Sequence, residues 1–152
     1  MISTTVSTVG LIAVASLAIV AEVCRRRQEL CTEATCSLQQ LVARSAEAFG
    51  RTDGARLVEE QRLSLSPRFS SESRNAVIAS LGKSFGEVQQ ALADSGTEVT
   101  AQDFMLCVLN YLQMDSKLAS AIMSSSEEAY RQRRYRIRKR MPLPLCNVFG
   151  LK

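Results

Sequence analysis

Hydrophobic positions divide the chain into one continuous apolar run and several stretches with helical spacing. Residues 1–21 include no charged side chain, and residues 9–21 are almost wholly apolar. With residues 6–8 in front and 22–24 behind, the run reaches the roughly 20 residues that a helix needs to cross a bilayer. The pattern therefore predicts a membrane span over residues 6–24, within a transmembrane anchor formed by residues 1–24.

Three other interpretations of this run compete with a span. A cleaved signal peptide requires basic residues before the apolar run, whereas here they follow it at residues 25–27. A lipoprotein signal requires a small residue before Cys24, and Val23 stands there. A buried core helix stays open, because the strictly apolar part is short. Since basic residues beside a span are kept on the cytoplasmic side, we expect a single-pass protein of the cytoplasmic membrane with its carboxyl-terminal domain in the cytoplasm.

The middle of the chain alternates helical spacing with breaks. Between residues 28 and 50, small or apolar residues recur at intervals of four and three: Leu30, Ala34, Leu38, Leu41, Ser45 and Ala48. This stripe has the width of a coiled-coil seam, and it fits either a dimer stalk or a helix packed on its own domain. Two glycines, Pro67 and a serine-rich run then predict a linker up to residue 70.

A second helical stripe leads into the carboxyl-terminal third. Its apolar positions, between residues 71 and 92, lie on one helix face: Val77, Ile78, Leu81, Phe85, Val88 and Leu92. Ser70 or Ser71 is the expected N-cap of this helix, because a serine hydroxyl accepts a hydrogen bond from a first-turn backbone N–H. The residues 93–98 that follow predict its end.

Three further helices are predicted after residue 99. The first begins at Thr100 as N-cap, carries Asp103 in its first turn, where the helix dipole favours a carboxylate, and is mostly buried. The second is very short and is capped by Asp115 or Ser116. The third begins at Ser126 and stops before Pro142. A long buried helix, a short helix, a tight polar turn and a basic helix form the layout of a helix-turn-helix unit.

The last of these helices concentrates the positive charge of a chain whose net charge is only +4. Placing Tyr130 inward, at about 100° per residue, puts Ile137, Met141 and Arg134 on the same side. A buried guanidinium needs a partner, and Asp103 is the nearest obvious carboxylate in the sequence. We therefore predict a structural salt bridge between Asp103 and Arg134.

The opposite face of the same helix has the side chains that nucleic-acid readers use. It carries Glu128, Gln132, Tyr135 and Lys139, flanked by Arg131, Arg136 and Arg138. Glutamine and arginine contact base edges in pairs of hydrogen bonds, while lysine and arginine bind phosphates. Double-stranded DNA is therefore the expected partner. The other interpretations are a solvated helix end that complements the dipole, and a lipid contact, which an outward face without large apolar residues disfavours.

Composition argues against catalysis. Histidine is absent, which removes the usual general base and the commonest zinc ligand. The cysteines, Cys24, Cys31, Cys36, Cys107 and Cys146, include no C-x-x-C pair, and they are expected to be reduced. Because the sequence has no arrangement of nucleophile and base either, we expect no enzyme, no metal site and no cofactor.

The basic run RYRIRKR at residues 134–140 follows the predicted helix-turn-helix layout that begins at Val99 and Thr100. With these parts, residues 84–143 resemble a known family, the LuxR-type helix-turn-helix, and in particular the carboxyl-terminal domain of membrane-anchored bacterial regulators. The family pattern reads roughly L-T-x-x-D-x-x-L-C, then S-x-K-E-I-A, then S-x-x-x-V-x-x-x-R-Y-R-L-R-K-K-L. The matching positions, some of them conservative replacements, are Val99, Thr100, Asp103, Leu106, Cys107, Lys117, Ser126 and residues 134–141. The run RYRIRKR at residues 134–140 is the specific part.

The resemblance implies roles for individual residues. Residues 126–140 would be the recognition helix, Lys117 would touch the DNA backbone, and Arg131, Gln132 and Tyr135 would be the chief DNA contacts. The chain departs from the pattern at residues 118–120, where the family has E-I-A, and at Ser125, Tyr130 and Pro142. Each apolar group lost from so small a core costs about 1–3 kcal/mol. The repeat-built sensor domain of the family has no counterpart, so we expect a shortened member.

Together these patterns predict an all-α protein with three parts: a transmembrane anchor (1–24), a helical stalk and linker (25–70), and a helix-turn-helix domain with its leading helix (71–152). The expected function is membrane-tethered, DNA-binding transcription regulation. The expected DNA-binding residues are Lys117, Ser126, Glu128, Arg131, Gln132, Tyr135, Arg136, Arg138 and Lys139. A homodimer is expected because two half-sites bound together gain from effective concentration, and an upstream sensor protein would supply the signal.

The alternative function is a membrane-anchored adaptor between proteins, whose helix-turn-helix has lost DNA binding. Glu127 and Glu128 ahead of the basic run, and the departures in the second helix at residues 118–120, are the reasons to keep this alternative.

Overall fold

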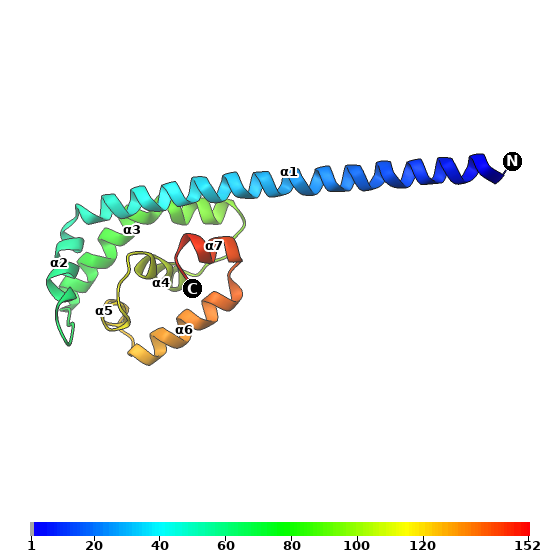
Figure 1. Ribbon diagram of the computed structural model, residues 1–152. Coiled ribbons are helices and arrows are strands. Elements are labelled where there is room, and N and C mark those ends of the chain that lie inside the picture. Colours follow the sequence, from blue (N-terminus) through cyan, green and yellow to red (C-terminus); the bar gives the residue numbers. More distant parts are fainter. Residues whose placement is uncertain (1) are drawn as a thin grey trace. The chain divides into compact units, whose positions relative to one another are not determined.

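The computed structural model describes residues 2–152, and their side chains at residue 14 and from residue 16 onward. Within these residues the chain forms seven α-helices and no strand, which confirms the prediction of an all-α protein (Figure 1). The helices are α1 (Ile2–Gly50), α2 (Asp53–Arg62), α3 (Ser71–Asp94), α4 (Ala101–Tyr111), α5 (Ser116–Ile122), α6 (Glu127–Arg140) and α7 (Leu143–Val148).

The chain divides into two compact units, one up to Cys36 and one from Ser37 to Lys152, and α1 contributes to both. The second unit holds all the buried core residues among those described. Residues 37–70 belong to the same unit as the residues that follow them, whereas the sequence pattern predicts a boundary at residue 71.

Apolar side chains in the first unit are exposed to solvent. Val14, Leu17, Ile19, Val20 and Val23 are between 55% and 69% exposed. Among the residues that the structure describes, no helix is both long and apolar enough to cross a membrane. Residues 6–13 and 15 of the expected span lie outside the described side chains. A membrane anchor at residues 6–24 therefore stays a prediction.

The end of α1 packs on its own domain. Val42, Ser45 and Phe49 are buried, and Leu38 and Leu41 are partly buried against the same core. Their spacing of three and four residues places them on one face of the helix. Other positions of the predicted stripe, Leu30, Ala34 and Ala48, are exposed. From residue 38 onward the stripe therefore belongs to a domain helix.

The predicted linker contains a helix. Thr52 begins α2, and its hydroxyl oxygen accepts a hydrogen bond from the Ala55 N–H at 3.2 Å. Gly54, which suggested a break in the pattern, is buried where α2 meets α3. A Cβ atom at this position would lie 2.6 Å from Ser80 Cβ and 3.2 Å from Val77 Cα. The glycine therefore allows the two helices to approach closely, and the prediction of an irregular linker through residues 53–62 is wrong.

The leading helix and the three helices after it form as predicted. In α3, five of the six predicted apolar residues are buried, and only Ile78 is exposed. Ser70, Thr100, Asp115 and Ser126 each accept a hydrogen bond from a first-turn backbone N–H. Because these caps satisfy N–H groups that have no partner inside the helix, they set where each helix begins. The helix α6 ends at Arg140, before Pro142.

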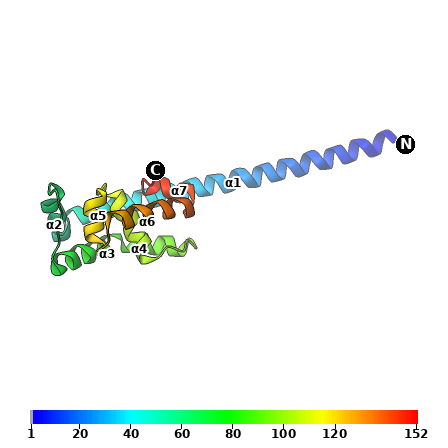
Figure 2. The same cartoon turned by 90° about the horizontal axis from the view of Figure 1, so that it is seen from below.

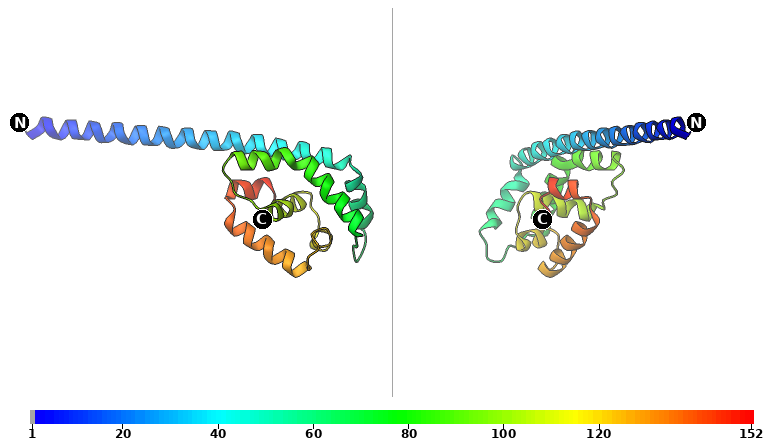
Figure 3. Two further views of the ribbon diagram at one scale, coloured as in Figure 1. Left: turned by 180° about the vertical axis from the view of Figure 1, so that it is seen from behind. Right: turned by 45° about the vertical axis from the view of Figure 1, so that its right-hand side comes forward.

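The helix α6 lies along one side of the second unit, with α4 between it and α3 (Figures 1 and 3). The short helix α5 packs mainly on α6, and it also meets α2, α3 and α4 (Figure 2).

The chain continues into a further helix, α7, which the sequence pattern did not indicate. The Cys146 thiol donates to the carbonyl oxygens of Arg138 and Met141, and the Asn110 side chain donates to the Phe149 carbonyl oxygen at 2.8 Å. Phe149 and Leu151 are buried. The last residues therefore complete the core beside the end of α6.

Candidate nucleic-acid interface

The helix α6 has one apolar side, which fixes how it is turned. Tyr130 and Ile137 are each 2% exposed, and Met141 packs partly against the same core. Burial raises the pKa of Tyr130 above its usual 10.0, even though the charge of Arg134 acts in the opposite direction. The predicted inward stripe is confirmed at Tyr130 and Ile137, and the opposite side of α6 is therefore the outward one.

Asp103 is buried and holds α6 through two arginines. Its Oδ1 accepts from Arg133 Nε at 2.8 Å, and its Oδ2 accepts from the Arg140 guanidinium at 2.5 Å. Arg133 also donates to the Gln102 side chain. The predicted pairing of Asp103 is thus right in kind but wrong in partner, because neither bond comes from Arg134.

The geometry of the helix explains the different partner. At 100° per residue, Arg133 and Arg140 lie about 60° and 80° to one side of Tyr130, whereas Arg134 lies about 40° to the other side. Asp103 faces the first of these two flanks. Arg134 is partly buried on the other flank, where its charge acts on Tyr130. The helical stripe predicted the inward direction correctly, but it could not indicate on which flank the carboxylate lies.

The charge of Asp103 is stabilised in place. Burial by itself would raise the pKa of this carboxyl, but the hydrogen bonds from Arg133, Thr100 and Arg140 outweigh burial and lower the pKa below 3.8. Asp103 therefore stays ionised at neutral pH, and α4 and α6 are joined by charge-assisted hydrogen bonds.

The outward side of α6 is polar, basic and open to solvent. Glu128, Arg131, Gln132, Tyr135 and Arg136 line one shallow hollow on the surface. Tyr135 is 57% exposed, and the Lys139 ammonium lies 4.8 Å from the centre of its ring. Arg138 is exposed beside them. The structure therefore brings these seven predicted residues to one accessible surface, here called the α6 outer face.

Two side chains of the α6 outer face are bonded to acidic residues at the start of the helix. The Arg131 guanidinium pairs with Glu127 at 2.5 Å, and the Gln132 side-chain amide donates to Glu128 at 3.1 Å. Arg136, Arg138 and Lys139 have no carboxylate within salt-bridge distance among the described residues. The acidic first turn and the basic last turn both complement the helix dipole. The positive charge of the α6 outer face is thus concentrated toward its carboxyl-terminal half.

The two remaining predicted residues lie near the amino-terminal ends of α5 and α6. Lys117 is exposed in the first turn of α5. Ser126 is the N-cap of α6, and its hydroxyl oxygen accepts from the Ala129 N–H at 3.1 Å. Ser126 therefore has a structural role whatever else it contacts.

The turn between α5 and α6 is fixed by a contact that the sequence did not indicate. Ser124 has a φ of 51°, a left-handed conformation that residues other than glycine seldom adopt. The Arg74 guanidinium, from the first turn of α3, donates to the Ser124 hydroxyl. This hydrogen bond joins residues 50 positions apart, and no periodicity along the chain could have revealed it.

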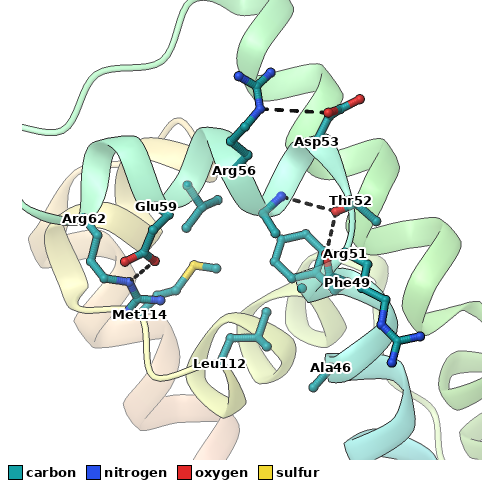
Figure 4. Close-up of a pocket in the computed structure, with 13 residues that line it drawn as sticks. Ala46, Phe49, Arg51, Thr52, Asp53, Arg56, Glu59, Arg62, Leu112 and Met114 are labelled. Carbon is teal, nitrogen blue, oxygen red and sulfur yellow. Dashed lines mark hydrogen bonds and ion pairs between the residues drawn. The ribbon is translucent and has the colours of Figure 1, made fainter.

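A second hollow, of about 620 Å³, lies between the end of α1, α2 and the α4–α5 turn (Figure 4). Its apolar lining includes Phe49, Leu112 and Met114. Four charged residues at its edge pair along α2: Glu59 accepts from Arg62 Nε at 2.8 Å, and Asp53 lies 3.9 Å from Arg56 Nε. Arg51, which also lines the hollow, has no carboxylate within salt-bridge distance among the described residues. The hollow therefore offers an anion one unpaired cationic group, whereas the α6 outer face offers three among the described residues: Arg136, Arg138 and Lys139.

The buried thiols have structural roles. Cys107 is fully buried in α4, and burial, helped by the negative charge of Asp103, raises its pKa to about 12. A thiol with so high a pKa is not a nucleophile at neutral pH. Cys107 packs as a small apolar side chain in the core.

Comparison with known proteins finds no family model, no curated protein and no solved structure that matches this chain. The resemblance to LuxR-type regulators therefore rests on the sequence pattern of residues 84–143 alone.

Proposed function

We propose that the second unit binds double-stranded DNA and that α6 reads the major groove through its outer face. The observation that carries this proposal is the division of α6 into two sides. Tyr130 and Ile137 anchor one side in the core, and the other side presents Gln132, Tyr135 and Arg136 to solvent. An anchored helix with exposed hydrogen-bond donors has the form that direct readout requires, because the major groove admits one α-helix.

Each part of the outer face has a task in this proposal. Gln132 and Arg131 lie near the amino-terminal end of α6 and would contact base edges. The Gln132 amide would pair one donor and one acceptor with adenine, and the Arg131 guanidinium would direct two donors at guanine. Arg136, Arg138 and Lys139 would bind phosphates, and Lys117 would do so from α5. The order of α4, α5, a tight turn and α6 fits the helix-turn-helix arrangement, in which the second helix of the pair enters the groove.

The fuller form of the proposal is a membrane-tethered transcription regulator that acts as a homodimer. The membrane tether is supported by the exposed apolar side chains between Val14 and Val23, which three arginines follow at residues 25–27. The homodimer is supported by the gain in affinity when two half-sites are bound together. Apolar side chains on an exposed helix gain free energy when a bilayer covers them, and the arginines would keep the second unit on the cytoplasmic side.

The test is fluorescence anisotropy of labelled duplex DNA with the fragment Ser37–Lys152, whose fold is checked by circular dichroism. We expect affinity to fall steeply as salt rises from 50 to 200 mM, because phosphate contacts release counterions. Gln132→Ala is expected to cost about 1–3 kcal/mol on preferred sequences and to relax the preference. Arg138→Ala should weaken all sequences equally and reduce the salt slope by about one.

Lys83→Ala is the matched control for Arg138→Ala. It also removes one exposed positive charge, but from α3. The two variants should therefore differ in DNA affinity although they carry the same net charge. Equal affinity of both variants and the parent fragment would count against the α6 outer face as the binding surface.

A second candidate function is the adaptor between proteins. The observation that favours it is the pairing of Arg131 with Glu127 and of Gln132 with Glu128, which occupies the two side chains best placed for base contacts. A folded fragment that binds no DNA even at 50 mM salt would favour the adaptor.

A further inference from the structure

A groove opens on the flank of α6 that faces α3 and α4. It measures about 650 Å³ and is formed by the start of α3, the start of α4, the α5–α6 turn and one side of α6. Eight of its fourteen lining residues are exposed, so it is an open channel in the surface. Only Arg136 belongs both to this groove and to the hollow on the α6 outer face.

The floor of the groove is apolar and adaptable. Ile78, the one residue of the α3 stripe that the core leaves exposed, lies here with 37% of its surface accessible. Met105 from α4 and Met123 after α5 are partly buried beside it. Methionine side chains are flexible and polarizable, so they fit apolar partners of different shapes. These residues lose unfavourable water contact if another apolar surface covers them.

The edge of the groove is positively charged. Arg74, Arg133 and Arg136 line it, and none of its lining residues is acidic. Asp103 compensates Arg133, whereas Arg74 bonds to the neutral hydroxyl of Ser124. Arg136 has no carboxylate within salt-bridge distance among the described residues. Two guanidinium groups at the edge are therefore without a compensating charge.

We propose that this groove docks an amphipathic helix of a partner protein, with apolar side chains on the inward face of that helix and carboxylates along its sides. Such a helix would place residues at i, i+3, i+4 and i+7 on Ile78, Met105 and Met123. Its carboxylates would meet Arg74 and Arg136. DNA phosphates would satisfy the same arginines but would leave the apolar floor uncovered. The inference goes beyond DNA binding, because the groove shares only Arg136 with the hollow on the α6 outer face, and its apolar floor lies outside that face.

Methionine methyl signals give a direct test. The full chain, labelled with ¹³C at its methionine methyl groups, is held in zwitterionic lipid nanodiscs and titrated with a synthetic peptide of 16 residues. The peptide has leucines at helical spacing and glutamates elsewhere, and a companion peptide replaces each glutamate with lysine. We expect saturable shifts of Met105 and Met123 with the acidic peptide only. Met114 and Met141 do not line the groove and serve as internal controls.

Two substitutions distinguish binding in this groove from binding at the α6 outer face. Ile78→Asp puts a like charge against the carboxylates of the peptide and is expected to abolish the shifts, while DNA affinity stays unchanged. Arg74→Gln, which keeps a donor for Ser124, is expected to weaken the peptide about tenfold. Lys83→Gln removes a charge from the same helix outside the groove and should leave peptide affinity as it was.

Three results would overturn the proposal. The lysine peptide could bind as tightly as the acidic one, which would remove the role of Arg74 and Arg136. The Met105 and Met123 signals could stay in place at saturating acidic peptide. Duplex DNA could shift these two signals and compete with the peptide, in which case the groove belongs to the nucleic-acid interface.

Discussion

Asp103 couples two helices through a single carboxylate. Thr100 caps the helix that carries it, and the two oxygens of Asp103 reach two turns of α6 through Arg133 and Arg140. Arg133 is about one-third exposed and Arg140 is 71% exposed, so water screens both interactions in part. The carboxylate itself is buried, and this makes the acid, more than either arginine, the sensitive member of the group.

Replacing Asp103 with Asn is therefore expected to lower the free energy of unfolding by about 1–3 kcal/mol, the range for losing charge-assisted hydrogen bonds at a buried acceptor. Urea denaturation followed by circular dichroism measures the change. Arg134→Gln is the control, because Arg134 forms no ion pair with the described residues and its loss should cost less. Equal losses of unfolding free energy in the two variants would favour the Asp103–Arg134 pair that the sequence predicted.

The same group predicts a dependence on acid. The folded pKa of Asp103 is lowered below 3.8, so the folded protein binds its proton at a lower pH than the unfolded chain does. The stabilisation is complete above the unfolded pKa and is lost as pH falls through the folded pKa. The difference in unfolding free energy between wild type and Asp103→Asn should be constant from pH 7 to about pH 5. This difference in unfolding free energy should shrink as pH falls below the unfolded pKa. A difference that increases at low pH would contradict the lowered pKa of Asp103.

At the scale of elements, the pairing of α2 with α3 depends on the absence of a side chain at Gly54. Alanine normally favours a helix over glycine by about 1 kcal/mol. Here the added Cβ would lie 2.6 Å from Ser80 Cβ, and the α3 backbone at Val77 is close as well. The helices would have to move apart, which uncovers the core beneath them.

We expect Gly54→Ala to lower the free energy of unfolding by about 1–3 kcal/mol, as overpacking does elsewhere. Gly86→Ala is the control, since a Cβ atom at that position in α3 meets nothing within 4 Å. It should stabilise the protein by about 0.5–1 kcal/mol. Thermal unfolding of both variants measures the contrast. A Gly54→Ala variant that is stabilised, as Gly86→Ala is, would contradict the close approach of α2 and α3 at Gly54.

The elements also show what a sequence can predict and what it cannot. Caps and apolar stripes are local signals, and they located α3, α4, α5 and α6 to within a few residues. The helix α2 was missed because its two-glycine context suggests a break, although Thr52 followed by Asp53 is an N-cap signal that could have revealed it. Contacts between distant parts of the chain could not be predicted in this way. The arginines that bind Asp103 are 30 and 37 positions away from it, and Arg74 and Ser124 are 50 positions apart.

At the scale of the whole molecule, the two units differ in whether their described apolar side chains are buried or exposed. The second unit contains its own core, to which α1 contributes Val42 and Phe49. The first unit exposes its described apolar side chains. Cutting the chain after Cys36 should therefore separate a folded domain from a segment whose described apolar side chains are exposed.

Removing residues 1–36 is expected to leave the melting temperature of the second unit within a few degrees of that of the full chain. Removing residues 1–50 should destabilise it by about 3–5 kcal/mol or prevent folding, because Phe49 and Val42 leave the core. Differential scanning calorimetry of the three chains distinguishes these outcomes. The shorter deletion should also release the protein from membranes into the aqueous fraction after centrifugation, whereas retention with the pellet would count against an anchor in the first 36 residues.

The two contacts of Asp103 with α6, to Arg133 and Arg140, also determine which side chains of this helix are available for binding. Because Arg133 and Arg140 are seven residues apart, they fix the angular setting of the helix about its own axis. A roll of one residue, about 100°, would replace Gln132 and Tyr135 by different side chains at the point of closest approach to a ligand. Asp103, a buried acid on a neighbouring helix, thus sets which side chains of α6 face outward.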